Sequence, residues 1–219
     1  MVDLIRGLTA EGVRTNLRRV RESISDAGRD PDQVEILAAV KYLPAEELAA
    51  LAAGGIRLVG ENRAQELAGK AVAGPAELTW DFIGHLQSRK VKDVLPRVRY
   101  IHSVASESAL AQLARYGTES TRVMVEVNVA GEAGKSGIAA SELAAFLDRC
   151  PVAVVGLMTM PPLTARAQDS RRHFAALREL AETHGLRQLS MGTSQDYEVA
   201  VQEGATIVRL GTILYQRTS

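Results

Sequence analysis

The stretch EILAAVKYLPAEEL, residues 35–48, decides the fold, because it sets a pattern that the rest of the chain repeats. Five apolar residues run without a break over 36–40, which is typical of a strand buried on both faces. Lys41 follows this strand, and Pro44 then precedes a helical pattern over 45–53. A buried strand, a short turn and a helix are the repeating unit of a parallel α/β fold.

The same unit recurs to the end of the chain, after an amphipathic helix over residues 9 to about 27. The expected strands are Ile36–Val40, Arg57–Val59, Thr79–Ile83, Tyr100–Ser103, Arg122–Asn128, Ala153–Leu157, Arg187–Leu189 and Thr206–Leu210. Eight strands alternating with helices predict a single (β/α)₈ barrel of the TIM type with an extra N-terminal helix. The domain is expected to span residues 1–219. Without the two weakest strands, 57–59 and 187–189, the pattern would instead fit an open doubly wound sheet.

Composition and charge narrow the class of protein. The 219 residues include 26 basic and 26 acidic side chains, so there is no electrostatic case for binding nucleic acid or an anionic membrane. A single cysteine, Cys150, is typical of a reducing cytoplasm. No apolar run approaches the roughly 18 residues that cross a bilayer, and the first 30 residues lack a signal-peptide pattern. We therefore expect a cytoplasmic protein.

Side-chain alternation along the first strand directs Lys41 into the mouth of the barrel. Leu37, Ala39 and Lys41 share one face, whereas Ile36 and Val40 share the other face and suit the helix layer. A lysine amine in such a position suits a Schiff base, because partial burial and neighbouring cations favour the neutral nucleophile. The alternative is that Lys41 is simply the first solvated residue after the strand, and its position alone leaves both interpretations open.

The stretch LSMGTSQDYEVAVQEGATIVRLGT, residues 189–212, contains the loops that follow the last two expected strands. In barrels these loops frequently bind phosphate through backbone N–H groups and hydroxyls at helix N-termini. Gly192 and Gly211 permit a close approach of the backbone, and a helix is expected to begin near Ser194 or Gln195. The hydroxyl donors of the two loops are Ser190, Ser194 and Thr212. We expect a phosphate site opposite Lys41.

Arg209 is the one cation on the last expected strand. If Val208 and Leu210 pack on helices, Arg209 points into the barrel near the phosphate loops. The spacing fits equally well with a structural ion pair between Arg209 and Glu126, which is also expected to point inward. The sequence pattern does not choose between these interpretations.

The motifs, taken in order, resemble the pyridoxal phosphate homeostasis protein family, whose members are similar to the N-terminal barrel domain of alanine racemase. The matching stretches are AAVKY (38–42), GENRAQE (60–66), FIGHLQSRK (82–90), IHSV (101–104), VEVNVAGEAGKSGI (125–138), GLMTM (156–160), LSMG (189–192) with a nearby serine, and VRLGT (208–212). They span most of the chain, so the resemblance implies the same barrel and a site for pyridoxal 5′-phosphate (PLP).

By this resemblance, Lys41 forms a Schiff base with PLP and Arg209 faces the pyridine nitrogen. The positions implied for cofactor binding are Lys41, Asn62, Met158, Ser190, Gly192, Ser194, Arg209, Gly211 and Thr212. No metal site and no catalytic residue are expected. The chain departs from the usual family pattern at Tyr42, Tyr215 and Gln216, and none of these is expected to touch the Schiff-base or phosphate residues.

A cation at the pyridine nitrogen favours a carrier over a catalyst. Arg209 would keep that nitrogen unprotonated and the cofactor a weak electron sink. The resemblance implies that alanine racemase takes a second acid/base from a C-terminal domain, which we expect to be absent here because the chain ends shortly after Thr212. Tyr42 is expected to point away from Lys41, so it is a poor substitute.

We therefore expect a PLP-binding carrier or regulatory protein, not an enzyme, that acts in PLP homeostasis and affects amino-acid metabolism. Its expected partners are PLP and, transiently, PLP-dependent apoenzymes, and we expect a monomer. One alternative is a weak PLP-dependent racemase-like enzyme. Another discards PLP and treats Lys41 as the Schiff-base lysine of an aldolase-type barrel.

Overall fold

The computed structural model describes residues 4–216 and contains eight parallel strands in one closed barrel. The strands are β1 (Glu35–Ala39), β2 (Leu58–Glu61), β3 (Thr79–Phe82), β4 (Tyr100–Val104), β5 (Arg122–Glu126), β6 (Ala153–Met158), β7 (Gln188–Thr193) and β8 (Ile207–Leu210). They pair in sequence order, and β8 closes the barrel on β1. The predicted TIM-type barrel is confirmed, and the open doubly wound sheet is excluded.

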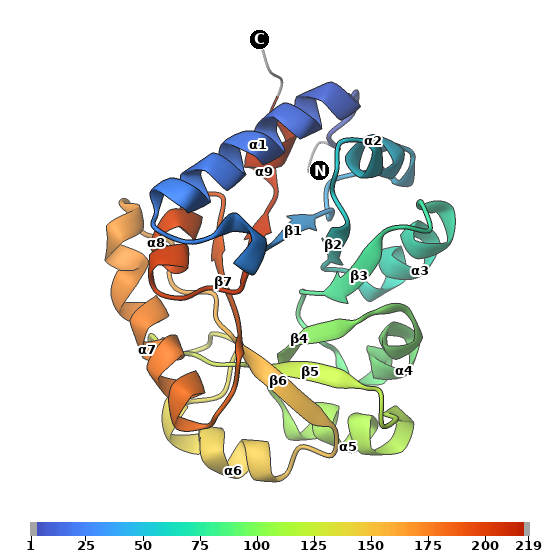
Figure 1. The fold of residues 1–219 in the computed structure, drawn as a ribbon. Helices are drawn as coiled ribbons and strands as arrows, with labels where there is room; N and C mark the ends of the chain where they lie inside the picture. The colour runs from blue at the N-terminus through green and yellow to red at the C-terminus, as the bar shows by residue number, and fades with distance from the viewer. Residues whose placement is uncertain (1–3, 217–219) are drawn as a thin grey trace.

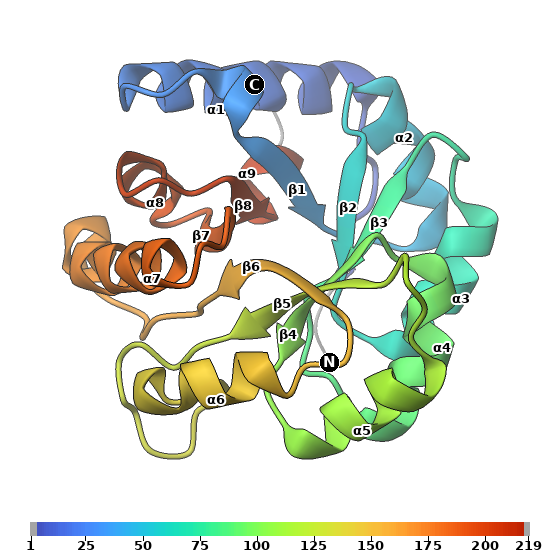
Figure 2. The ribbon, with the colours of Figure 1, turned by 60° about the horizontal axis from the view of Figure 1, so that its bottom comes forward.

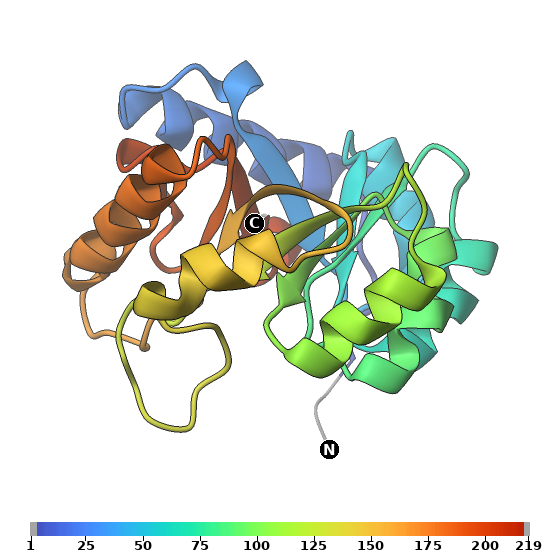
Figure 3. The same ribbon diagram turned by 90° about the horizontal axis from the view of Figure 1, so that it is seen from below.

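Helices follow the strands and cover the outside of the barrel (Figure 1). They are α1 (Ala10–Asp26), α2 (Leu48–Ala53), α3 (Ala64–Ala73), α4 (Val91–Val94), α5 (Glu107–Tyr116), α6 (Leu143–Asp148), α7 (Arg171–Thr183), α8 (Tyr197–Gln202) and α9 (Thr212–Tyr215). The connection between β5 and α6 projects from the body in Figures 2 and 3. Within residues 4–216, no helix has the length and apolar character needed to cross a membrane.

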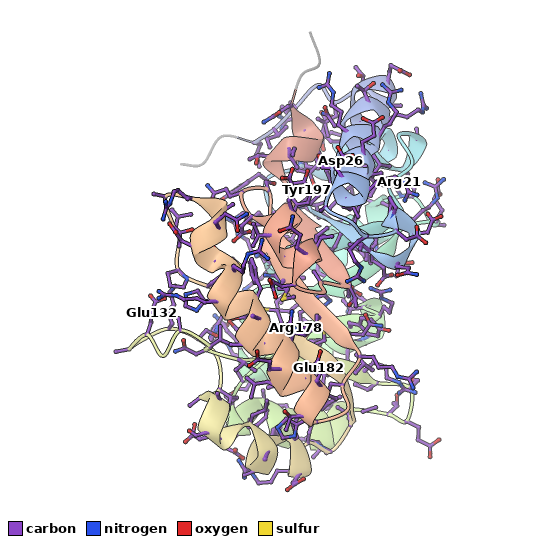
Figure 4. The ribbon with its side chains drawn as sticks, turned by 60° about the vertical axis from the view of Figure 1, so that its left-hand side comes forward. Arg21, Asp26, Glu132, Arg178, Glu182 and Tyr197 are labelled. Atoms are coloured by element: carbon purple, nitrogen blue, oxygen red, sulfur yellow. The ribbon has the colours of Figure 1, made fainter. Side chains whose placement is uncertain are left out.

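The helix α1 is the predicted extra element at the N-terminal end. Oγ1 of Thr9 accepts a hydrogen bond from the backbone N–H of Gly12 at 3.1 Å and so caps the first turn. Gly28 ends the helix with φ +86°, a conformation that glycine adopts at little cost. The apolar face of α1 packs against α2, α8 and α9, and Figure 4 shows Tyr197, the first residue of α8, beside α1.

Alternation along the strands sorts the apolar residues into two clusters. The larger cluster lies between the strands and the helices and includes Ala38 and Val40. The smaller cluster fills the lower part of the barrel interior and consists of Leu37, Leu58, Met124, Met158 and Ile207, with partly buried neighbours. The prediction that Leu37 points into the barrel while Val40 packs on helices is confirmed.

The region between β7 and α8 differs from the predicted pattern. The strand β7 extends to Thr193 with a register shift against β8, whereas the sequence predicted a short strand over 187–189. The helix α8 begins at Tyr197, not near Ser194 or Gln195. The carboxylate of Asp196 accepts hydrogen bonds from the N–H and the hydroxyl of Thr193, at 2.8 and 3.0 Å, and these bonds hold the preceding residues in a turn.

Candidate cofactor-binding site

A cavity of about 300 Å³ opens where the carboxyl ends of β1, β2, β7 and β8 meet. Barrel enzymes place their sites at this end of the strands. Six of the nine predicted cofactor positions line this cavity: Lys41, Asn62, Ser194, Arg209, Gly211 and Thr212. The fold therefore brings together residues from both ends of the chain, as the sequence predicted.

The amine of Lys41 reaches the cavity from the connection that follows β1. Its Nζ lies 4.5 Å from the ring centroid of Tyr42, which lines the same cavity. The prediction that Tyr42 points away from Lys41 is wrong, because β1 ends at Ala39 and the strand alternation ends with it. Among residues 4–216, the lysines that form ion pairs are Lys70, Lys90 and Lys135. Lys41 has no carboxylate partner in this part of the chain.

A buried ion pair fixes the two connections that carry Lys41 and Asn62. Nζ of Lys70 donates to Oε2 of Glu61 at 2.6 Å and to the carbonyl oxygen of Val40 at 2.8 Å. Oε1 of Glu61 accepts the backbone N–H groups of Asn62 and of the next residue, at 2.7 and 3.0 Å. Because Val40 directly precedes Lys41, this pair ties the end of β1 to the end of β2.

Arg209 points into the barrel from β8 and forms the floor of the cavity. Its Nη1 donates to the backbone oxygen and to Oγ of Ser190, both at 2.6 Å. Its Nη2 donates to the carbonyl oxygen of Thr159 at 2.8 Å and to Sδ of Met160 at 2.9 Å. No acceptor for the remaining N–H, on Nε, is found among the described residues. This one N–H is therefore left for a ligand in the cavity.

The alternative ion pair between Arg209 and Glu126 is not formed. The carboxylate of Glu126 instead accepts a hydrogen bond from Oγ of Ser136 at 2.8 Å. Burial lowers the pKa of Arg209 to about 10, although the charges of Glu126 and Asp196 oppose this shift. The guanidinium thus remains cationic at neutral pH, without a carboxylate in contact in the part of the chain that is described.

The ends of β7 and β8 present hydroxyl groups along one wall of the cavity. The backbone N–H of Gly211 donates to Oγ of Ser194 at 3.2 Å, so the two loops touch. Within residues 4–216, nothing accepts the hydroxyl protons of Ser194 and Thr212. A Cβ atom on Gly211 would make only ordinary van der Waals contacts, the nearest at 3.8 Å to the carbonyl oxygen of Ala39. These features suit an anionic group that accepts several hydrogen bonds.

The side-chain oxygen of Asn62 supplies an independent sign that the cavity takes a ligand. This atom is buried in the cavity wall, and no donor reaches it from the described residues. Leaving a buried acceptor unpaired is costly, so a ligand with a donating group fits here. A cation at the floor, an amine at the rim and hydroxyls on the wall fit a small phosphorylated ring with a carbonyl group and a phenolic hydroxyl.

Comparison with known proteins identifies the family. The sequence matches the family model described as "Alanine racemase, N-terminal domain" over residues 9–218. It is 39% identical over 216 residues to a "Pyridoxal phosphate homeostasis protein" of Pseudomonas aeruginosa, and the match covers 94% of each chain. A protein of the same description from Aquifex aeolicus is 37% identical, with 91% of this chain and 93% of that protein covered. The chain belongs to the pyridoxal phosphate homeostasis protein family.

A solved structure within this family supports the same fold. PipY of Synechococcus elongatus, in a structure described as having PLP bound, superposes with a TM-score of 0.77 at 30% identity. The superposition covers 93% of this chain and all of that chain. The likeness therefore extends over most of this chain.

Two positions that the resemblance to this family assigned to the cofactor lie deeper than the cavity. Met158 is 2% exposed and belongs to the apolar cluster inside the barrel. Met160, two residues further along the same face, lines the cavity instead. Ser190 is fully buried below the guanidinium of Arg209 and does not line the cavity.

A third position, Gly192, borders a neighbouring cavity of about 420 Å³. Its φ is +91°, and a Cβ atom there would lie 2.6 Å from Cβ of Ala200 and 3.0 Å from Cα of Tyr197. The residue must therefore be glycine because α8 packs closely on β7. This packing requirement accounts for the glycine without a phosphate contact.

Tyr215 is a cavity residue that the sequence reasoning missed. Its hydroxyl donates to the carbonyl oxygen of Ala39 at 3.0 Å, and its ring lines the cavity close to Gly211. Burial raises the pKa of Tyr215, so the phenol stays protonated and bound to Ala39. The expectation that this residue stays away from the site is wrong, because α9 is a single turn that brings Tyr215 back over β1. The three-residue spacing from Thr212 could have indicated this.

His102 and Asp81 form a second group that the sequence reasoning missed. Both side chains are fully buried, and Nε2 of His102 lies 3.0 Å from Oδ2 of Asp81. Nδ1 of His102 lies 2.8 Å from Oγ of Ser190. The sequence indicates only that Tyr100 and His102 share the inward face of β4. This alternation does not identify Asp81 as the partner of His102.

Proposed function

We propose that this chain binds PLP reversibly in the cavity and acts in PLP homeostasis as a carrier or regulator. The observation that carries the proposal is the convergence of four groups on one cavity: the amine of Lys41, the Nε–H of Arg209 and the hydroxyls of Ser194 and Thr212. The family relationship and the description of PipY as a PLP complex support the same ligand.

Each group has a distinct part in this proposal. Lys41 would hold PLP as a Schiff base, formed at its aldehyde with loss of one water. Ser194, Gly211 and Thr212 would hold the phosphate, and Arg209 would face the pyridine nitrogen. PLP supplies an electron-withdrawing ring to whatever amine it carries. The cavity residues of this chain position that ring and hold its charge.

Two properties of the cavity favour a carrier over a catalyst. The cationic Arg209 disfavours a proton on the pyridine nitrogen, which limits electron withdrawal by the ring. Among residues 4–216, the cavity lining contains neither a carboxylate nor a histidine. Of its two tyrosines, Tyr215 is bound to Ala39 and Tyr42 lies against Lys41 itself. The alternative, weak PLP-dependent racemisation of amino acids, requires a second acid/base opposite Lys41.

The wider role follows from reversible binding. A Schiff base in an open cavity exchanges with other amines, so bound PLP is available for transfer to PLP-dependent apoenzymes and for buffering against amino acids. We propose a cytoplasmic monomer, and the single cysteine is in keeping with a reducing compartment. Light scattering in solution tests the monomer, and a fall in mass on dilution would contradict it.

The absorption spectrum of the protein with PLP, before and after borohydride, tests the proposed function. Reduction followed by peptide mapping should find the pyridoxyl group on Lys41. An adduct on Lys70, Lys90 or Lys135 instead would contradict the assignment.

The carrier role is tested separately with D- and L-alanine. Each amino acid should perturb the spectrum or release PLP without racemising the pool. Racemisation or transamination at rates typical of enzymes, about 1–10³ s⁻¹, would overturn the carrier role and leave the PLP site standing.

A further inference from the structure

A chain of polar side chains runs through the barrel interior beneath the cavity. Nη1 of Arg209 donates to Oγ of Ser190 at 2.6 Å, and this hydroxyl lies 2.8 Å from Nδ1 of His102. Nε2 of His102 lies 3.0 Å from Oδ2 of Asp81, which also accepts from Nη2 of Arg99 at 2.8 Å. We refer to Arg209, Ser190, His102 and Asp81 as the buried relay.

One arrangement of protons satisfies every member of the buried relay. Burial would raise the pKa of Asp81, but hydrogen bonds from His102 and Arg99 outweigh it and lower this pKa, so the carboxylate is ionised and acts as an acceptor. His102 therefore carries its proton on Nε2, and Nδ1 accepts the hydroxyl proton of Ser190. Oγ of Ser190 is then free to accept from Arg209. Burial lowers the pKa of His102, which keeps the ring neutral as this arrangement requires.

We propose that Ser190, His102 and Asp81 are positioning residues that hold Arg209 under the PLP ring, and that Ser190 is not a phosphate ligand. The inference rests on the proposed PLP site. Arg209 is a buried cation with no carboxylate in contact among residues 4–216, and Ser190 and His102 link it to the carboxylate of Asp81, which also pairs with Arg99. The relay engages Nη1 of the guanidinium, and Nε has no acceptor among the described residues, which leaves its N–H for a ligand in the cavity that Arg209 lines.

The positions of two serines along β7 separate these roles. Ser190 pairs with Ile207 in the ladder, two residues below Arg209 on β8. Ser194 contacts Gly211, two residues above Arg209. The two hydroxyls thus lie on opposite sides of the guanidinium, and only Ser194 belongs to the wall that faces a phosphate.

A matched pair of variants, S190A and S194A, tests the proposal with PLP and with pyridoxal, which lacks the phosphate. S190A should weaken the binding of both ligands by a similar factor, roughly tenfold, and should shift the absorption of the bound cofactor because Arg209 is no longer held. S194A should weaken PLP more than pyridoxal. If S190A lowers the preference for PLP as S194A does, Ser190 is a phosphate ligand and the proposal is wrong. Unchanged affinities and an unchanged spectrum in S190A would also overturn it.

The variant D81N tests whether the negative charge of Asp81, and not only the size of its side chain, affects the bound cofactor. Asparagine keeps the size of the side chain and can still accept from His102, but it removes the negative charge at the end of the relay. We expect D81N to reproduce the spectral shift of S190A while preserving the preference for PLP over pyridoxal. A spectrum identical to that of the unaltered protein would show that Asp81 does not act on Arg209.

A measurement without ligand tests the relay itself. Nitrogen-15 NMR of the histidine rings should show that the ring of His102 is neutral with its proton on Nε2. The variant H102N should remove that signal, and S190A should shift its Nδ1 resonance. A ring of His102 protonated on Nδ1 or on both nitrogens would overturn the relay. Failure of the unaltered protein to form the Lys41 adduct would instead contradict the proposed function, so the two failures are distinguishable.

Discussion

Two lysine amines lie on either side of the end of β1, and their surroundings differ sharply. Lys70 is 5% exposed, and its Nζ lies 2.6 Å from a carboxylate oxygen of Glu61 and 2.8 Å from the carbonyl oxygen of Val40. Lys41 is half-buried at the cavity rim, and its nearest charged or aromatic contact is the ring of Tyr42 at 4.5 Å. The amine of Lys70 thus donates two hydrogen bonds, one of them to a carboxylate, whereas Lys41 has no carboxylate partner among the described residues.

The difference shows that the surroundings of a lysine amine decide whether it has a structural or a chemical role in this barrel. A lysine held between a carboxylate and a carbonyl stays charged and fixed, so it serves as a structural bridge and is a poor nucleophile. A lysine beside a cavity and without a carboxylate partner retains the mobility and the access that Schiff-base formation requires. The buried pair moreover fixes Val40, the residue next to Lys41, so the structural lysine positions the reactive one.

Replacing Lys41 gives the largest expected effect on chemistry. K41A should lose the borohydride-trapped PLP adduct completely, while PLP remains bound more weakly through its phosphate. The free energy of unfolding in urea should change by no more than about 0.5 kcal/mol, because the side chain is partly exposed and has no ion-pair partner in the described residues. K90A, which removes a surface lysine, is the matched control and should keep the adduct. An adduct that persists in K41A would show that Lys41 is not the lysine that reacts with PLP.

Replacing Lys70 should have the opposite effect, with stability lost and chemistry retained. K70M leaves the fully buried carboxylate of Glu61 without its cation, which typically costs about 3–5 kcal/mol. Urea denaturation measures this loss, and the double variant K70M/E61Q should recover part of it because no unpaired charge remains. The folded fraction of K70M should still form its PLP adduct at Lys41. A destabilisation below about 1 kcal/mol would show that the pair does not hold the ends of β1 and β2.

The order of the barrel elements and the inward direction of Leu37 were predictable because each depends on a short-range pattern. Runs of apolar residues followed by helical spacing fix the order of the elements, and alternation along β1 turns Leu37 inward. Lys41 lies beyond the end of β1, so its place at the cavity does not follow from that alternation. The family motifs then indicated the cavity residues Asn62, Ser194 and Thr212, which the fold does bring together.

The depth of a residue along its strand was not predictable in the same way. Met158 and Ser190 have the expected inward direction, yet each lies below the level of the cavity. That level depends on the stagger of neighbouring strands and on the register shift between β7 and β8, which no local pattern encodes. The contact between His102 and Asp81 was hidden for the same reason, since it joins β4 to β3 through the barrel interior.

Removing the hydroxyl of Ser194 tests whether the phosphate site directs the aldehyde of PLP to Lys41 and not to Lys70. A charge-assisted hydrogen bond contributes about 1.5–3 kcal/mol, so S194A should weaken PLP binding by roughly 10- to 100-fold. Pyridoxal, without a phosphate, should bind weakly to both proteins and with similar affinity. Titration followed by absorbance measures both constants. Equal affinities for PLP and pyridoxal in the unaltered protein would show that the phosphate does not orient the ligand toward Lys41.

Acid titration should have the smallest effect, and it separates the buried ion pair of Lys70 and Glu61 from the buried relay. Burial lowers the pKa of His102 below its unfolded value of about 6.5, so the unfolded chain binds this proton first as the pH falls. The free energy of unfolding should therefore be constant above about pH 6.5 and fall below it. Asp81, whose pKa is also lowered, keeps its contribution until the pH falls below about 3.9.

The slope between pH 6.5 and 4.5 is the quantity that decides this prediction, and each histidine contributes at most about 1.4 kcal/mol per pH unit. Urea denaturation at several pH values should show a shallower slope in H102N, with H173Q as the control for the second histidine whose pKa burial lowers. K70M should keep the slope of the unaltered protein although its total stability is lower, because Lys70 and its carboxylate lie outside the buried relay. If the free energy of unfolding of K70M no longer fell between pH 6.5 and 4.5, or if that of H102N fell as steeply as in the unaltered protein, the Lys70–Glu61 pair and the buried relay would not be independent.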